Sequence, residues 1–178
     1  MKIKSVLFFL IVFAAGSGLF AADIEVGALG GVAVWEDTVS VSGAPEMRWL
    51  FALEGKPFVA GLGAQARYNF TSYDGYTQNE VLAYALASVD YPLIPRLSLR
   101  AQAAVGGGWL GADGGDGASV GAFAVRPAAG VMYEFKPVSV FLLAGSEFVI
   151  VEDATKTTIT VDLGATWRFR DSNGGSDD

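Results

Sequence analysis

Hydrophobic and polar residues alternate strictly between Thr157 and Phe169. The apolar positions are Ile159, Val161, Leu163, Ala165, Trp167 and Phe169. The positions between them are Thr158, Thr160, Asp162, Gly164, Thr166 and Arg168. In a β-strand, successive side chains point to opposite faces, so a period of two over a dozen residues predicts a strand with one apolar and one polar face.

The same period recurs in residues 46–53, 58–70, 96–109 and 119–135. Residues 24–35, 81–91 and 138–151 are less regular and leave the strand register open, but their lengths match and they fill the gaps in the order. Strands of roughly 11–16 residues suit a tilted crossing of a bilayer. The chain is therefore predicted to be all-β: an eight-stranded antiparallel up-and-down transmembrane β-barrel over residues 23–169.

The connections between these strands alternate in character. Three are short and contain proline: 55–57, 92–95 and 136–137. Four are longer or more polar: 36–45, 71–79, 110–117 and 152–156. Outer-membrane barrels have short periplasmic turns and longer outer loops, so this alternation predicts which end of the barrel faces the periplasm.

Aromatic residues gather near both ends of the predicted strands. The tight-turn end is expected to carry Phe58, Tyr91, Tyr133, Phe135, Trp167 and Phe169. The loop end is expected to carry Trp49, Tyr68, Phe70, Trp109 and Phe148. Amphipathic rings favour the head-group depth of a bilayer, so the pattern predicts two aromatic girdles.

The two chain ends lack this pattern. Lys2 and Lys4 precede a short apolar run, and small residues follow at Ala21 and Ala22. This layout is typical of a secretory signal peptide over residues 1–21, with cleavage after Ala21 or Ala22. Residues 170–178 are rich in Gly, Ser and Asp and are expected to form a disordered acidic tail.

Alternation alone does not distinguish a membrane barrel from a soluble one. Every Lys after the leader falls in a predicted connection (Lys56, Lys136 and Lys156), whereas a solvated outer face normally uses Lys freely. The polar faces are also rich in glycine, which suits the narrow interior of an eight-stranded barrel. Both features favour polar faces that point inward and apolar faces that point to lipid.

The predicted inward faces carry acids and bases in equal number. The acids are Glu25, Glu46, Glu134, Glu147 and Asp162. The bases are Arg48, Arg67, Arg100, Arg126 and Arg168. A buried charge is costly unless it is paired and hydrogen-bonded, and the planar guanidinium can meet a carboxylate with two bonds. We therefore expect an ion-paired network that closes the barrel.

The strand pattern resembles that of the small outer-membrane β-barrel superfamily, the OmpA/OmpX/OmpW-like barrels. The most specific piece is the last strand, where Asp162, Gly164, Trp167 and Phe169 match the assembly signal of such proteins. The usual pattern stops at the final aromatic residue, whereas this chain continues beyond Phe169. The resemblance implies the outer membrane of a Gram-negative bacterium, with outer-membrane lipids and the barrel-assembly machinery as partners.

Catalytic chemistry is poorly represented. The chain has no His and no Cys, which removes Ser-His and Cys-His catalysis and the usual zinc ligands. We therefore expect no enzymatic activity, no metal and no cofactor. The formal net charge of −7 argues against nucleic acid as a partner.

These observations leave three functional hypotheses. The first is a closed barrel with a structural or surface-exposed role, presenting loops 36–45, 71–79, 110–117 and 152–156 to a host or surface ligand. The second is a narrow porin-like channel, or an OmpW-like conduit for small or apolar solutes, which the apolar inner faces of 81–91 and 138–151 keep open. The third is a soluble periplasmic ligand-binding barrel.

Overall fold

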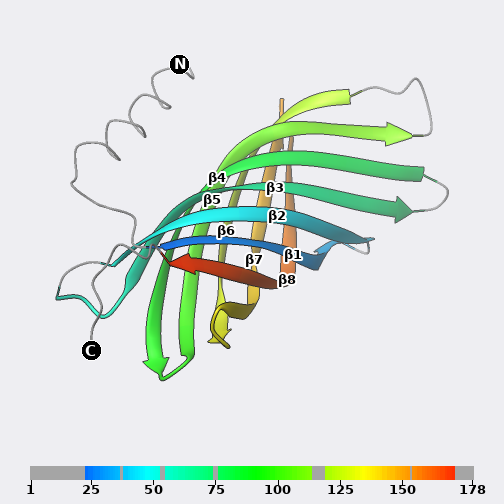
Figure 1. Ribbon diagram of the computed structural model, residues 1–178. Helices are drawn as coiled ribbons and strands as arrows, with labels where there is room; N and C mark the ends of the chain where they lie inside the picture. The colour runs from blue at the N-terminus through cyan, green and yellow to red at the C-terminus, as the bar shows by residue number, and fades with distance from the viewer. Residues whose placement is uncertain are drawn as a thin grey trace, which may run out of the picture.

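The computed structural model describes residues 23–36, 38–52, 55–73, 76–113, 119–152 and 154–170. They form a single closed barrel of eight strands, each hydrogen-bonded to its neighbours in the sequence, with β1 and β8 completing the circle (Figure 1). The strands are β1 Asp23–Trp35, β2 Thr38–Ala52, β3 Val59–Tyr73, β4 Tyr76–Ile94, β5 Leu97–Asp113, β6 Ser119–Glu134, β7 Val138–Val151 and β8 Ala154–Arg170. All pairings are antiparallel, which confirms the predicted fold class.

The start of β1 and the end of β8 lie side by side, because Asp23 pairs with Arg170. We call this end of the barrel the terminal end and the opposite end the distal end. The connections β2–β3, β4–β5 and β6–β7 lie at the terminal end, and the other four lie at the distal end. The predicted signal peptide and all but the first residue of the predicted tail lie outside the described residues.

The register determines how far the strands tilt. A path that follows paired residues round the barrel leaves β6 at Ala129 and returns to the same strand at Ser119, ten residues away. This stagger of ten residues, at about 3.3 Å each, is divided by the circumference of eight strands about 4.8 Å apart to give the tangent of the tilt angle. The strands are therefore tilted by about 40° from the barrel axis. This tilt lies within the range of transmembrane barrels.

The distal connections are shorter than the sequence pattern predicted. Between strands, only residues 36–37, 74–75 and 152–153 remain, together with 114–118. The predicted contrast between short turns at one end and longer loops at the other is therefore wrong, since the β2–β3 connection at the terminal end spans 53–58.

The polar residues that suggested loops belong to strands that continue towards the distal end. Ser40 and Thr71, which were predicted in loops, face the interior, and their hydroxyl oxygens lie 2.5 Å apart. Beside them, the amide of Asn69, from the predicted strand 58–70, donates to Glu80 Oε2 at 3.0 Å. These side chains bond across neighbouring strands, so a polar composition marks the inner face here and not a loop. Lys156 was also predicted in a connection, but it lies in β8.

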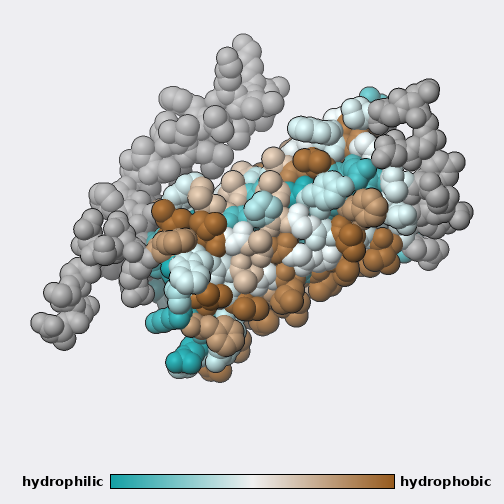
Figure 2. All heavy atoms as spheres, turned by 45° about the vertical axis from the view of Figure 1, so that its right-hand side comes forward, coloured by the Kyte–Doolittle hydropathy of each residue, from teal (hydrophilic) through white to brown (hydrophobic). Residues whose placement is uncertain are grey.

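The outward face is apolar over most of its height. Many large hydrophobic side chains are exposed on it, among them Val41, Leu99, Val105, Leu142, Val161 and Leu163. Figure 2 shows this surface as brown side chains along the lower side of the barrel wall. The inward face of the same strands holds most of the buried polar and charged groups, so the barrel has the reverse polarity of a water-soluble one.

The predicted aromatic girdles need one correction. Tyr68, Phe70 and Trp109 are exposed near the distal end, and Tyr133, Phe135, Trp167 and Phe169 are exposed near the terminal end. Trp49 was expected with the distal group, but it pairs with Ile24, whose other partner is Phe169, so it lies at the terminal end. The reason is that β2 runs from the distal end to the terminal end, and Trp49 lies near the end of this strand.

Candidate functional site in the barrel interior

All ten charged residues predicted to face inward lie on the inner face. Eight of them are buried, and Glu134 and Arg168, at the terminal end, are half-buried. Side chains alternate between the two faces of a strand, and each of these charged residues falls on the face that also carries the buried residues of its strand. The charged side chains gather into two clusters, one towards each end of the barrel.

The terminal cluster consists of Glu25, Glu46, Arg48, Asp90, Arg100, Glu134 and Arg168. Glu25 is its centre: it contacts Arg48 directly, lies 3.5 Å from Arg100 Nη2, and accepts a 2.7 Å hydrogen bond from Arg168 Nη2. Arg100 also donates to both carboxylate oxygens of Asp90, at 2.7 and 2.9 Å. Glu25, Arg48 and Arg100 have fully buried side chains, so their charges are balanced within the protein and not by solvent.

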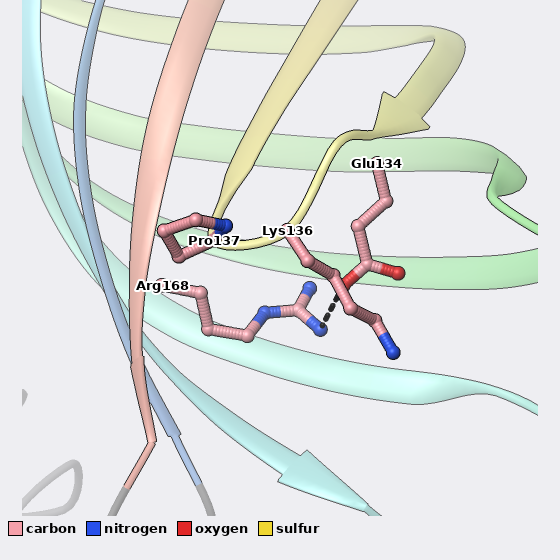
Figure 3. A pocket seen from close by; sticks show the side chains of 4 residues that line it. All are labelled: Glu134, Lys136, Pro137 and Arg168. Atoms are coloured by element: carbon pink, nitrogen blue, oxygen red, sulfur yellow. Dashed lines mark hydrogen bonds and ion pairs between the residues drawn. The ribbon is translucent and has the colours of Figure 1, made fainter.

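Two acids complete the terminal cluster at its edges. Glu46 Oε1 lies 3.6 Å from Arg48 Nε, and Glu134 Oε1 lies 3.4 Å from Arg168 Nη1. A cavity of about 320 Å³ opens at this mouth, lined by Glu134, Lys136, Pro137 and Arg168. Figure 3 shows the Glu134–Arg168 ion pair facing this cavity, with the Lys136 side chain extending past it from the β6–β7 turn. Further into the barrel, buried ion pairs and packed apolar side chains fill the interior.

The distal cluster consists of Arg67, Arg126, Glu147, Asp162, Asn69, Tyr84, Glu80 and Lys156. Asp162 joins two strands that are far apart in sequence, because it accepts a 3.0 Å hydrogen bond from Arg67 Nη1 on one oxygen and contacts Arg126 with the other. Glu147 lies 3.4 Å from Arg67 Nε and accepts a 2.9 Å hydrogen bond from the Tyr84 hydroxyl. The side chains of Asp162, Arg67 and Arg126 are fully buried.

An apolar layer lies between the two clusters. Leu29, Ala44, Ala128, Met132, Phe141 and Leu143 pack together there. On β1, Leu29 lies between Glu25 of the terminal cluster and Gly31, which pairs with Asp162 of the distal cluster. The ring of Phe141 also packs under the Arg100 guanidinium, whose central carbon is 5.0 Å from the ring centroid. The interior of the described barrel is thus filled by side chains at three successive levels.

Sequence reasoning missed four charged residues on the inner face. Asp90 pairs with Arg100, while Glu80 pairs with Lys156 at the distal end. Asp23 lies 3.9 Å from Arg168 Nε at the terminal end. With these residues the five predicted acids become eight and the five predicted bases become six. The signal was present in the sequence: every second residue from Glu80 to Asp90 falls on one face, and Lys156 shares the parity of Asp162.

The Lys156 side chain shows why a lysine is accepted on the inner face. Its ammonium contacts Glu80 and lies 5.5 Å from the centroid of the Trp35 ring. The carboxylate and the aromatic face together replace the water that the ammonium would otherwise bind. Among the described residues, no group of His, Cys, Asp and Glu is arranged to hold a metal ion.

No protein-family model and no curated protein sequence matches the chain. Its fold is nevertheless similar to that of solved bacterial barrels. Neisserial surface protein A is 15% identical, with a TM-score of 0.57 and coverage of 87% of this chain and 100% of that one. Ail, the attachment invasion locus protein of Yersinia pestis, is 15% identical, with a TM-score of 0.53 and coverage of 84% and 100%.

A third similar structure is that of the outer-membrane enzyme PagL, at 11% identity, a TM-score of 0.53 and coverage of 79% of this chain and 97% of that one. Proteins with this fold therefore include an enzyme, so the fold does not decide enzymatic activity. Within the described residues, no helix is long and apolar enough to cross a membrane. The closed register, the apolar outer face and these similarities together show that the chain has the fold of the small eight-stranded outer-membrane β-barrels.

Proposed function

We propose that the protein is an outer-membrane barrel whose interior is closed, and that it serves as a structural or surface-exposed membrane component. The observation that carries this proposal is the filled interior. The two ion-paired clusters and the apolar layer between them occupy successive levels of the lumen. An ion crossing such a barrel would have to displace buried Arg–carboxylate pairs, which is costly because it leaves uncompensated charge in a poorly solvated site.

The channel and conduit alternatives gain less support. The apolar inner residues of β4 and β7, which suggested a path for apolar solutes, pack against each other: Leu82, Leu86 and Val149 belong to one buried cluster. Leu143 belongs to the apolar layer. Side chains that fill each other's space support a packed core and not an open path.

Single-channel recording tests the closed interior. The refolded wild-type protein in a planar bilayer is expected to give no conductance steps above those of the bilayer alone, provided that folding is verified beforehand by the different gel mobility of unboiled and boiled samples. Reproducible steps would overturn the proposal and support the narrow channel. In that case, substitution of Arg48, Arg67 or Arg100 should change ion selectivity, because these side chains line the lumen.

We further propose that the protein is not an enzyme. The absence of His and Cys from the chain supports this, because it removes the usual base and the usual thiol nucleophile. A host or surface ligand at the distal end also remains a proposal. Few residues lie between the strands at the distal end, so few are placed to contact such a ligand. The longest distal connection, 114–118, lies outside the described residues.

The last strand supports a proposal about assembly. Trp167 and Phe169 are exposed on the lipid-facing side of β8, whereas Asp162 and Gly164 face inward. If Phe169 is read by the barrel-assembly machinery, Phe169→Ala should lower the amount of folded protein in cells while leaving refolding in detergent unchanged. Phe135→Ala is a matched control, because Phe135 is an exposed aromatic at the same end. Equal losses in cells for both variants would contradict a signal specific to β8.

A further inference from the structure

The basic residues whose side chains the structure describes fall into two groups according to whether they meet a carboxylate. The six cations on the inner face all form ion pairs with Asp or Glu: Arg48, Arg67, Arg100, Arg126, Lys156 and Arg168. Lys56, Arg96 and Lys136 are exposed, and none of them has an ion pair or a side-chain hydrogen bond with another described residue. Among the described side chains, these three cations are thus the ones without a carboxylate at ion-pair distance.

These three cations occupy equivalent places in the fold. Each lies in one of the three turns that join strands at the terminal end. Each also adjoins a proline and a large hydrophobic residue, in the segments Lys56–Phe58, Ile94–Arg96 and Phe135–Pro137. Ile94 and Phe135 are more than half exposed, at 61% and 62%. A cation directly beyond an exposed apolar side chain is the arrangement expected at the phosphate level of a bilayer, with the apolar group in the lipid.

The distal turns have the opposite charge. The connections 36–37, 74–75, 114–118 and 152–153 each contain at least one Asp or Glu, and none contains Lys or Arg. Two acids whose surroundings are described, Glu36 and Glu152, are exposed. The turns are thus charged asymmetrically along the barrel axis: the three terminal turns hold three cations and one acid, Glu54, whereas the four distal turns hold acids and no cation.

We propose that Lys56, Arg96 and Lys136 bind the phosphate groups of anionic phospholipids in the leaflet at the terminal end. This inference rests on the proposed function, because it requires an inserted barrel. Cations near an anionic lipid surface attract it with an energy that corresponds to about five-fold in partitioning for each Lys or Arg. The acidic distal turns lack such cations, so the same surface would repel them.

Tryptophan fluorescence measures this lipid preference at one end of the barrel. The chain has four Trp residues, of which Trp49 and Trp167 lie at the terminal end. In a Trp35→Phe, Trp109→Phe background they alone report. This protein is refolded into phosphatidylcholine vesicles that contain an equal fraction of either brominated phosphatidylglycerol or brominated phosphatidylcholine. The brominated phosphatidylglycerol is expected to quench more strongly, by the amount that corresponds to an enrichment of this lipid of about two- to five-fold around the terminal end. High salt should remove the difference between the two quenchers.

The variants separate the three turns from the rest of the protein. Lys56→Gln, Arg96→Gln and Lys136→Gln, combined in that background, should abolish the difference between the two quenchers. The matched control, Glu36→Gln with Glu152→Gln, removes two distal charges and should retain it. Equal quenching in an inserted parent protein, or enrichment that survives the triple substitution, would overturn the inference. A chain that inserts into neither vesicle would instead overturn the proposed function.

Discussion

Replacement of Asp162 by asparagine is expected to destabilise the folded barrel by about 3–5 kcal/mol. Asp162 is fully buried and pairs with both Arg67 and Arg126. Asparagine has nearly the same size but no charge, so the variant would leave two buried guanidinium groups without their shared counter-ion. The free energy of unfolding, from urea titration of the refolded protein in lipid vesicles, measures the loss.

A second substitution distinguishes lost charge balance from a general disturbance of the core. If repulsion between uncompensated cations causes the loss, Arg126→Gln should cost less in the Asp162→Asn background than in the wild type, with a coupling energy of about 1–3 kcal/mol. Glu36→Gln is the control, because Glu36 is exposed in a distal turn and its loss should change stability by no more than about 0.5 kcal/mol. Additive effects of the two core substitutions would count against the paired arrangement.

Replacement of Gly106 by alanine is expected to destabilise the barrel by about 1–3 kcal/mol or to prevent it from folding. Gly106 lies on the inner face of β5, and a Cβ atom there would overlap the main-chain carbonyl oxygen of Ala83 on β4. A backbone atom in a hydrogen-bonded strand cannot move aside as a flexible side chain can. The close approach of β4 and β5 at this point therefore requires glycine.

Gly43 provides the matched substitution for this test. It lies on the outward face of β2, and an added Cβ would meet no atom within 4 Å. Gly43→Ala should thus be neutral or should stabilise the barrel by about 0.4–1 kcal/mol, because alanine restricts the unfolded chain more than glycine does. Measured as for Asp162→Asn, the unfolding free energy should fall for Gly106→Ala and should stay unchanged or rise for Gly43→Ala. Equal effects would mean that the inter-strand approach at Gly106 is not the limiting contact.

Much of the barrel follows from the sequence by itself. A period of two is a local property of an extended chain, so the alternation in segments such as 157–169 determined that strands form and which residues share a face. Low lysine content in the strands indicated that the polar face points inward. Arg67 and Asp162 do point inward, as predicted. Lys156 is a lysine on the inner face of a described strand, and the sequence pattern had assigned it to a connection.

Only the tertiary structure decided where the strands end and which charges meet. The polar residues at the distal end of β2 and β3 are compatible with a loop or with an inner strand face, and the choice depends on partners in other strands, such as Thr71 for Ser40. The partners of Asp162 lie 95 and 36 residues away in the sequence. The alternation of polar and apolar residues is a property of one strand, so it shows only that these side chains all face the lumen. The register of eight strands and their closure into a barrel bring particular acids and bases into contact.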